Sequence, residues 1–429
     1  MPVAYYSFGC KVNQYETELI RQSFEKNGFK TAEQGSNADI IVINTCTVTA
    51  QSDLKLRKLL HRLRRENKSA VIAVCGCFAE VVADPLSELP EADIVVGNAD
   101  KRRLPDIVTR FFEQKAPIFE KTPENRDYPE EEVTAFSKKT RGIIKIQDGC
   151  DRFCSYCIIP YARGRSRFKP LEKIKEEAEA LVRSGHKELV VVGINLSDYG
   201  KGGDLNLSDA VKAVCESGAE RVRLGSLEPE LLSRDIIERL AKNKNLCPHF
   251  HLALQSGCDK TLKEMRRKYD KAEYFTIVSS LREHFPGCAI TTDIMVGFPG
   301  ESDEDFAESL EFVKQIAFAD AHIFPYSPRK GTPAALRSDQ IPGSIKEQRA
   351  KAMSEAVSES RKSYLSGLVG STVEVLFEKE KSPEFHQGHS RNYCVVKVKR
   401  FTDTLFRQTE NVVITGSDGE SLFGEIIQR

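Results

Sequence analysis

Apolar runs alternate with amphipathic stretches along the first hundred residues. Four apolar strands are predicted, at residues 3–9, 39–46, 70–77 and 92–97. Amphipathic helices are predicted between them, at residues 14–28 and 52–66. Strands separated by helices indicate a doubly wound parallel sheet, whose ligands bind at the carboxyl ends of the strands. We therefore expect an α/β domain over residues 1–117, followed by an acidic, proline-containing linker over residues 118–138.

The same alternation continues through the middle of the chain. Further apolar strands are predicted at residues 142–147, 188–193, 221–224, 250–254, 289–295 and 321–324, with helices at 171–184 and 207–217. Roughly six strand–helix units indicate a barrel or partial barrel over residues 139–366. After a helical run at 344–366, short β-rich stretches at 371–377, 393–398 and 410–415 predict a small five-stranded barrel over residues 367–429.

Composition and charge add few constraints. With 429 residues, 40% of them hydrophobic and 29% charged, the chain resembles a globular protein of two or three domains. Lys plus Arg and Asp plus Glu balance at 63 each, so a nucleic-acid surface would have to be local. The first residues lack the features of a signal peptide and no apolar run could span a bilayer. We therefore expect a cytoplasmic protein with reduced thiols and no membrane partner.

Three closely spaced cysteines are the strongest chemical signal. Cys150, Cys154 and Cys157 stand four and three positions apart, an arrangement that chance would give with a probability of roughly 0.01 over the chain. Three thiolates can hold a 4Fe–4S cluster and leave one iron open to a small molecule. Zinc is the main alternative, but a structural zinc site normally adds a second cysteine pair or histidines, and none is nearby. A disulfide framework is a weaker alternative in a reducing compartment.

A second cysteine triad is predicted at the strand ends of the first domain. Cys10 follows the first predicted strand, Cys46 ends the second and Cys77 ends the third. Residues 75 and 77 would point to the same face of a strand, so Cys75 competes with Cys77 as the third ligand, and we favour Cys77. Small buried apolar residues are the alternative interpretation. The other cysteines fit no ligand spacing and are interpreted as structural thiols, namely Cys215, Cys247, Cys258, Cys288 and Cys394.

The residues around both triads resemble those of a known family. The spacing of Cys150, Cys154 and Cys157 resembles that of the radical S-adenosylmethionine (SAM) superfamily. The segments Phe8-Gly-Cys-Lys-Val-Asn-Gln-Tyr-Glu-Thr-Glu18, Asn44-Thr-Cys-Thr-Val48 and Cys75-Gly-Cys-Phe-Ala79 resemble those of its methylthiotransferases. The resemblance implies two 4Fe–4S clusters, SAM as cofactor, an open (β/α)6 barrel and a C-terminal TRAM domain. It also implies that the central cluster cleaves SAM to a radical and that Cys10, Cys46 and Cys77 hold an auxiliary cluster that delivers sulfur.

Polar segments at the ends of central strands resemble those that hold SAM in this family. They begin at Gly193, Gly225, Gln255 and Asp293. A carboxylate such as Glu228 can accept hydrogen bonds from ribose hydroxyls or an amine, although alone it would be interpreted as a turn residue. The predicted cofactor-binding residues are Gly193, Asn195, Ser226, Glu228, Gln255, Asp293 and Gly297.

Basic residues near the cysteines and in the last module are candidates for substrate binding. Arg163, Arg165 and Arg167 follow the central triad and suit phosphate or carboxylate, with an exposed loop as the alternative. The segment 388–396 resembles the TRAM domain, in which Arg391 and Tyr393 would contact RNA backbone and base. The basic helix at 52–66 is as consistent with a solvated face as with phosphate binding.

Motif details are most similar to the branch that acts on N6-threonylcarbamoyladenosine beside the tRNA anticodon. The resemblance then implies as partners the tRNA anticodon loop, an external one-electron reductant of the flavodoxin or ferredoxin type, and the iron–sulfur assembly machinery. Sister branches act on N6-isopentenyladenosine or on a ribosomal-protein aspartate, and these residues do not exclude the isopentenyl branch. An RNA-binding iron–sulfur sensor without turnover is the alternative of a different class.

Overall fold

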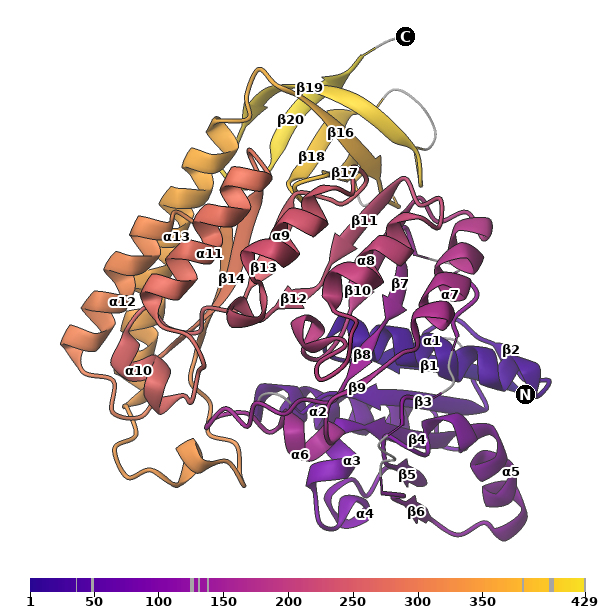
Figure 1. Ribbon diagram of the computed structural model, residues 1–429. Helices are drawn as coiled ribbons and strands as arrows, with labels where there is room; N and C mark the ends of the chain where they lie inside the picture. The colour runs from indigo at the N-terminus through magenta and orange to yellow at the C-terminus, as the bar shows by residue number, and fades with distance from the viewer. Residues whose placement is uncertain are drawn as a thin grey trace. The chain divides into compact units, whose positions relative to one another are not determined.

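The computed structural model describes residues 1–35, 37–47, 50–123, 127–129, 132–136, 139–379, 382–400 and 405–427 (Figure 1). The chain forms two compact units. The first unit comprises Met1–Val133, Gln147–Lys169 and Ser327–Leu336, and the second comprises Thr134–Ile146, Pro170–Tyr326 and Arg337–Arg429. Both cysteine triads therefore belong to the first unit.

A six-stranded, wholly parallel sheet forms the centre of the first unit. Its order is β2-β1-β3-β4-β5-β6. The strands are β1 (Pro2–Ser7), β2 (Lys30–Thr31), β3 (Ile40–Thr45), β4 (Val71–Gly76), β5 (Ile94–Val96) and β6 (Ile118–Glu120). The order reverses between β1 and β3, and in such sheets the crevice beyond the carboxyl ends at that point is the usual ligand site. The predicted doubly wound sheet is thus confirmed.

Helices cover both faces of this sheet because successive strand residues point to opposite sides. Val3 and Tyr5 pack with Ile20 and Phe24 of α1 (Lys11–Lys26) and with residues of α5 (Leu104–Gln114). On the other face, Ile41 and Ile43 pack against Leu56, Leu60 and Leu63 of α2 (Ala50–Glu66). The short helices α3 (Cys77–Val81) and α4 (Pro85–Glu88) complete that second layer, and η1 (Lys101–Arg103) precedes α5.

The predicted linker is partly structured. Residues 118–120 form β6, which pairs in parallel with β5. Farther on, Val133 and Phe136 are buried, and the Phe136 N–H donates to His186 Nε2 at 3.1 Å within the second unit. Residues 124–126, 130–131 and 137–138 lie outside the described part of the chain. An edge strand of three residues is too short to show a periodic pattern.

In its described residues, the second unit first forms seven parallel strands in two sheets. The first sheet has the order β11-β10-β7 and the second β12-β13-β14-β15. Their bounds are β7 Gly142–Lys145, β10 Glu188–Val192, β11 Arg221–Leu224, β12 Ser226–Leu227, β13 His249–Leu252, β14 Ala289–Val296 and β15 Asp320–Pro325. Only Gly225 separates β11 from β12, and its N–H donates to Val191 O at 2.8 Å. These strands form the partial barrel predicted from the sequence.

Helices on the outer side of these strands begin at local capping signals. The larger ones are α7 (Leu171–Arg183), α8 (Leu207–Cys215), α9 (Arg234–Ala241), α11 (Lys271–His284), α12 (Asp303–Ile316) and α13 (Gly343–Ser366). Reciprocal capping boxes begin three of them, through the pairs Asn206–Asp209, Asp270–Glu273 and Ser302–Asp305. Shorter helical segments are η2 (Leu196–Asp198), η3 (Pro229–Leu231) and α10 (Asp259–Glu264), and η4 (Pro333–Leu336) lies in the first unit.

A closed five-stranded barrel ends the second unit, as predicted. Its order is β16-β17-β18-β20-β19. The strands are β16 (Thr372–Phe377), β17 (Phe385–Ser390), β18 (Val395–Lys399), β19 (Thr409–Ser417) and β20 (Leu422–Ile426). Apolar side chains that include Val375, Val396 and Val412 fill its interior. In the described part of the chain, every helix is too short or too polar to cross a lipid bilayer.

Candidate active site

Cys10, Cys46 and Cys77 lie at the carboxyl ends of three neighbouring strands. Cys10 is the N-cap residue of α1, Cys46 follows β3, and Cys77 begins α3 directly after β4. Gly9 lets the first two loops meet: its φ is +89°, and a Cβ there would lie 2.8 Å from Cys46 Sγ. Cys10 is also close enough to Cys77 to raise the pKa of that thiol, after the larger effect of burial. The topology therefore brings the second predicted triad together at one sheet edge.

The structure separates Cys75 from Cys77, contrary to the expectation that both share one strand face. Strand β4 ends at Gly76, whose φ of 107° and ψ of −162° turn the chain into α3. The Cys75 side chain remains in the core beside Val3 and Tyr5, where burial raises its pKa to about 12. Burial also raises the pKa of Cys77, and Arg163 and Lys101 partly oppose that effect. Lys101 has the same opposing effect at Cys75, so the place of Cys77 beyond the strand end, and not its pKa, distinguishes the two thiols.

Cys150, Cys154 and Cys157 occupy a loop bracketed by a short antiparallel pair, β8 (Gln147–Asp148) and β9 (Arg167–Phe168). The Cys150 N–H donates to Gly164 O at 3.1 Å, and the Cys157 N–H donates to Cys154 O at 3.0 Å. Cys154 is buried, whereas Cys150 and Cys157 are half-buried.

Gly149, directly before this loop, stands where any side chain would clash with the backbone. Gly149 has a φ of +73°, and a Cβ there would lie 2.0 Å from Arg165 O. The turn therefore fixes the approach of the cysteine loop to the residues that follow α6 (Ile159–Arg163). Three thiols on one short loop are a donor set that fits a cluster with one open iron. Within the described residues, no three Cys, His, Asp or Glu side chains converge on a single metal-ion position.

The three arginines after the loop have different environments. Arg163 and Arg167 are buried and paired with carboxylates, so their guanidinium groups are not available to an external phosphate in this structure. Arg165 alone is exposed, with 69% of its side chain accessible, and its guanidinium lies 4.7 Å from the Phe153 ring. Contact with substrate therefore stays a prediction for Arg165 and does not fit the burial of the other two.

The residues predicted to hold SAM lie in the second unit, along or beyond the carboxyl ends of its strands. Gly193 and Asn195 follow β10, Ser226 lies on β12 with Glu228 just after it, and Gln255 follows β13. Asp293 lies within β14 and Gly297 follows it. On β14, Ile290, Thr292 and Ile294 are buried, whereas Thr291 and Asp293 are half-buried. Thr291 and Asp293 therefore lie on the sheet face opposite the one that carries the three buried side chains.

Several side chains on or just after the strands of the second sheet have features that suit a polar ligand. Gln255 adopts a left-handed φ of +66°, and its buried Oε1 has no hydrogen-bond partner among the described residues. Glu228 forms an ion pair with Arg267, whose side chain is 3% exposed. The Asp293 carboxylate lies between two histidines, with Oδ2 3.2 Å from His251 Nε2 and Oδ1 3.7 Å from His322 Nδ1. A buried unsatisfied oxygen and fixed carboxylates fit a ligand that carries amine and hydroxyl donors.

Sequence reasoning pointed to one of these partners and missed two. Arg267 lies in the segment 265–269, which resembles a family segment that contacts substrate or cofactor, and the structure adds its ion pair with Glu228. His251 and His322 gave no local signal, because the register of the parallel strands alone sets His322 opposite Asp293 and His251 opposite Thr291.

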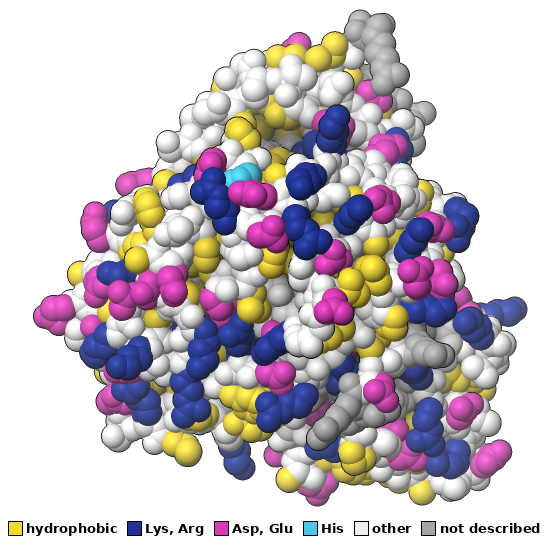
Figure 2. All heavy atoms as spheres, in the orientation of Figure 1, with side chains coloured by type: hydrophobic (Ala, Val, Ile, Leu, Met, Phe, Trp, Pro, Cys, Tyr) yellow, Lys and Arg dark blue, Asp and Glu magenta, His cyan; other side chains and the backbone are white. Residues whose placement is uncertain are grey.

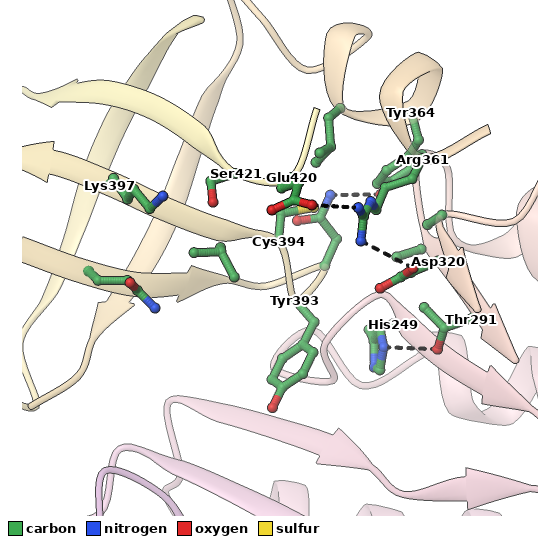
Figure 3. Close-up of a pocket in the computed structure, with 16 residues that line it drawn as sticks. His249, Thr291, Asp320, Arg361, Tyr364, Tyr393, Cys394, Lys397, Glu420 and Ser421 are labelled. Carbon is green, nitrogen blue, oxygen red and sulfur yellow. Dashed lines mark hydrogen bonds and ion pairs between the residues drawn. The ribbon is translucent and has the colours of Figure 1, made fainter. Parts of the chain in front are cut away.

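Arg391 and Tyr393, predicted to contact RNA, pack inside the second unit. Arg391 Nη2 donates to Lys244 O at 2.6 Å and to Leu246 O at 3.1 Å. The Tyr393 ring stacks on His389 at a centroid distance of 4.5 Å and lies 5.0 Å from the His249 ring. Tyr393 and His249 also line a cavity of about 440 Å³ together with Arg361, Asp320 and Glu420 (Figure 3). The turn between β17 and β18 therefore contacts the amino ends of the central strands.

A buried ionic cluster lies at this contact between the C-terminal barrel and the central strands. Glu188, the first residue of β10, receives hydrogen bonds from Arg141 Nε at 2.7 Å and from Arg223 Nε at 2.8 Å, and Arg221 Nε lies 2.9 Å from it. Arg221 and Arg223 also donate to Ser390 O of the C-terminal barrel, at 2.9 and 3.3 Å. Although burial opposes ionisation, the three arginines hold the pKa of Glu188 well below its ordinary value.

The surface carries both signs of charge. Figure 2 shows Lys and Arg side chains interspersed with Asp and Glu over the face that it presents. On α2, Arg57 and Arg64 pair with Glu88 and Asp93, while the remaining basic side chains of the predicted basic helix and the residues just after it are exposed, namely Lys55, Lys58, Arg62, Arg65 and Lys68.

Comparisons with known proteins define the class. Residues 144–313 match the model of the radical SAM superfamily, and residues 2–97 match the uncharacterized protein family UPF0004. The radical SAM methyltransferase TsrM from Kitasatospora setae has a similar fold, with a TM-score of 0.58 at 13% identity over 78% of this chain and 77% of that chain. The likeness to TsrM shows a shared fold.

Relatives of known name narrow the family further. The chain is 36% identical over 418 residues to "Threonylcarbamoyladenosine tRNA methylthiotransferase MtaB" of Bacillus subtilis (strain 168), which covers 96% of this chain and 91% of that protein. It is 39% identical to the protein of the same name from Thermotoga maritima, over 87% of this chain and 85% of that protein. It is 33% identical to "tRNA-2-methylthio-N(6)-dimethylallyladenosine synthase" of Bacillus licheniformis, over 98% and 85%. The chain belongs to the radical SAM methylthiotransferase family, which implies a 4Fe–4S cluster and SAM as cofactors.

Proposed function

We propose that this enzyme transfers a methylthio group to C2 of N6-threonylcarbamoyladenosine next to the anticodon of tRNA. The observation that carries the proposal is the end-to-end similarity to proteins named for this reaction, at 36% identity over 96% of the chain. Methylthiolation of N6-dimethylallyladenosine is the second candidate, because relatives named for it are 33% identical over 98% of the chain.

Polar side chains on the second sheet favour the first candidate. His251, Asp293 and His322 form a hydrogen-bonded or ion-paired row across β13, β14 and β15. A threonylcarbamoyl group carries a carboxylate and a hydroxyl, and histidine N–H groups such as those of His251 and His322 can donate to them. A dimethylallyl group is a hydrocarbon and offers these histidines no hydrogen bond.

In the proposed mechanism, Cys150, Cys154 and Cys157 hold the radical-generating cluster and leave one iron for SAM. When bound there, a cluster would supply the single electron for reductive cleavage of SAM, and with it the radical chemistry needed to activate C2 of the adenine. Gly149 and the Cys150–Gly164 hydrogen bond keep the loop in shape. Within the second unit, Glu228, Gln255 and Asp293 would orient SAM by accepting from its amine and ribose hydroxyls, while the turns at Gly193 and Gly297 admit the adenine.

A second cluster held by Cys10, Cys46 and Cys77 belongs to the same proposal. The three thiolates would hold that cluster, which would supply the sulfur of the methylthio group, with a second SAM as the methyl donor. Exposed cations near the sites would bind tRNA phosphates, with Arg165 and the α2 residues Lys55, Lys58 and Arg62 as the candidates. An external one-electron reductant, assembly of the clusters by other proteins and a cytoplasmic location complete the proposal.

Nucleoside analysis of tRNA from cells tests this proposal. In cells that lack the gene, digestion and mass spectrometry should find 2-methylthio-N6-threonylcarbamoyladenosine absent and its precursor accumulated. The parent gene should restore the product, and a Cys154→Ala gene should not. Loss of the dimethylallyl product instead would support the second candidate, and no change in either nucleoside would contradict both.

A further inference from the structure

Arg163 is a buried charged residue that follows the central cysteine loop. It is the last residue of α6, and its side chain is 1% exposed. Its Nη2 donates to Asn13 Oδ1 at 2.6 Å, and its Nη1 donates to Glu16 Oε1 at 2.7 Å and to Asp148 Oδ1 at 3.1 Å. One side chain thus joins α1 to the base of the central cysteine loop.

The α1 partners of Arg163 hold the loops of the other triad. Asn13 Nδ2 donates to Phe8 O at 2.9 Å and to Thr45 O at 2.7 Å. Phe8 stands two residues before Cys10, and Thr45 directly precedes Cys46. The Cys10 Sγ itself lies 3.8 Å from Asn13 Oδ1. Arg163 therefore holds the Asn13 side chain, which in turn holds the loops that carry Cys10 and Cys46.

Arg163 and its neighbour Gly164 also contact residues at the start of the central cysteine loop. Asp148 stands two residues before Cys150, and it also accepts from Arg167 Nη2 at 2.9 Å. The backbone carbonyl of Gly164, the next residue after Arg163, accepts the Cys150 N–H at 3.1 Å. The backbone around Arg163 thus holds the central loop while its side chain holds the auxiliary loops.

Arg163 belongs to a buried ionic network. Lys101 Nζ lies 2.5 Å from Glu16 Oε2, Arg163 pairs with Glu16 and Asp148, and Arg167 pairs with Asp148. All five side chains are less than a tenth exposed. Asn13 Oδ1 lies 2.6 Å from Arg163 Nη2 and 3.8 Å from Cys10 Sγ, so the guanidinium is a buried cation close to an auxiliary thiol. A cluster bound by three thiolates is anionic, and a cation beside it in a buried site would stabilise it.

We propose that Arg163 is a positioning residue that couples the two cysteine sites, holding the Cys10 and Cys46 loops in place and compensating the negative charge of the auxiliary cluster. The inference rests on the proposed auxiliary cluster at Cys10, Cys46 and Cys77. It gives Arg163 a role different from the substrate contact predicted from the sequence.

The test uses the full chain with Cys154→Ala, so that the auxiliary site alone contributes iron. Arg163→Met and Arg163→Lys are compared with Arg165→Met, a matched control on the same loop whose side chain is 69% exposed. The readouts are the rate at which a chelator removes iron, the reduction potential of the cluster by electron paramagnetic resonance, and the far-ultraviolet circular dichroism spectrum.

Arg163→Met should lose iron about 10-fold faster, as expected for loss of an outer-shell partner, and its potential should become more negative because a nearby cation is removed. Arg163→Lys should also lose iron faster, with a smaller change in potential, because it keeps the charge without the paired contacts. Arg165→Met should match the parent.

Unchanged iron loss in Arg163→Lys and an unchanged potential in Arg163→Met would overturn the inference, and if Arg163→Met does not fold, Arg163→Lys decides alone. Absence of iron in the Cys154→Ala parent would instead contradict the proposed auxiliary cluster itself.

Discussion

Single residues at strand ends decide which thiols the first unit offers to a ligand. Gly76 turns the chain so sharply that Cys75 stays in the core and Cys77 begins a helix. Its backbone lies in a region that is almost exclusive to glycine. The choice between two cysteines two positions apart thus depends on the conformation of the residue between them.

The first prediction concerns that choice. In the Cys154→Ala background, Cys77→Ala should abolish the remaining iron, because the ligand itself is removed, whereas Cys75→Ala should keep it. Iron analysis after anaerobic reconstitution measures both. Retention in Cys77→Ala together with loss in Cys75→Ala would reverse the assignment.

A second prediction concerns Gly76 itself. Gly76→Ala places a Cβ 2.6 Å from Thr45 O in an unfavourable backbone conformation, so the free energy of unfolding of the apo protein should fall by about 3 kcal/mol or more. Gly28→Ala is the matched control. Gly28 also has a positive φ, of +82°, but a Cβ there would meet no atom within 4 Å, so the loss should be about 1 kcal/mol. Urea unfolding compares them, and equal losses would show that close approach at Gly76 is unimportant.

At the scale of elements, the sequence pattern predicts the long strands and helices well and the short ones poorly. Apolar runs bounded by polar residues predict β3, β4 and β14, whereas β2, with two residues, and β6, with three, are too short to show a period. The spacing of Cys150, Cys154 and Cys157 is a local pattern, so the sequence alone predicts their shared role. The sequence alone does not predict the buried role of Arg163, because its partner Glu16 is 147 residues away in the chain.

The turn at Arg391 and Tyr393 illustrates the same limit. Basic and aromatic residues on a β-turn suit RNA, but they suit a protein contact equally well, and here they pack on the central strands. The contact is made by the C-terminal barrel at the amino ends of those strands, where Glu188 joins Arg141, Arg221 and Arg223.

A third prediction follows for this joint. Glu188→Gln should lower the free energy of unfolding of the second unit by about 3–5 kcal/mol near neutral pH, because it leaves buried arginines without their counter-charge. The folded-state pKa of Glu188 is depressed, so the stabilisation is fully present above the ordinary value of 4.5 and is lost as the pH falls below it. Unfolding curves at several pH values should therefore show a flatter acid dependence for the variant than for the parent, and parallel curves would contradict this assignment.

At the scale of the whole molecule, the functional residues divide between the two compact units. The first unit holds both cysteine triads, and the second holds the residues predicted to bind SAM. Family membership assigns a radical SAM methylthiotransferase activity to the chain as a whole. Because the triads are separate sets of residues, the radical step and the transfer of sulfur should be separable by substitution.

The fourth prediction tests this separation. Under reduction, Cys10→Ala should still release methionine and 5′-deoxyadenosine from SAM but form no methylthio product, because the central loop is intact. Cys154→Ala should release neither compound while keeping auxiliary iron. Chromatography of the SAM products measures both, and cleavage that survives Cys154→Ala would place the radical chemistry elsewhere.

The most direct measurement of the central claim uses the purified, reconstituted enzyme with reductant and SAM. Equal amounts of two anticodon stem-loops, one with N6-threonylcarbamoyladenosine and one with N6-dimethylallyladenosine, are offered together, and the nucleosides are analysed by mass spectrometry. We predict that the threonylcarbamoyl substrate is methylthiolated in clear preference. Preferential methylthiolation of the dimethylallyl substrate, or of neither, would contradict it.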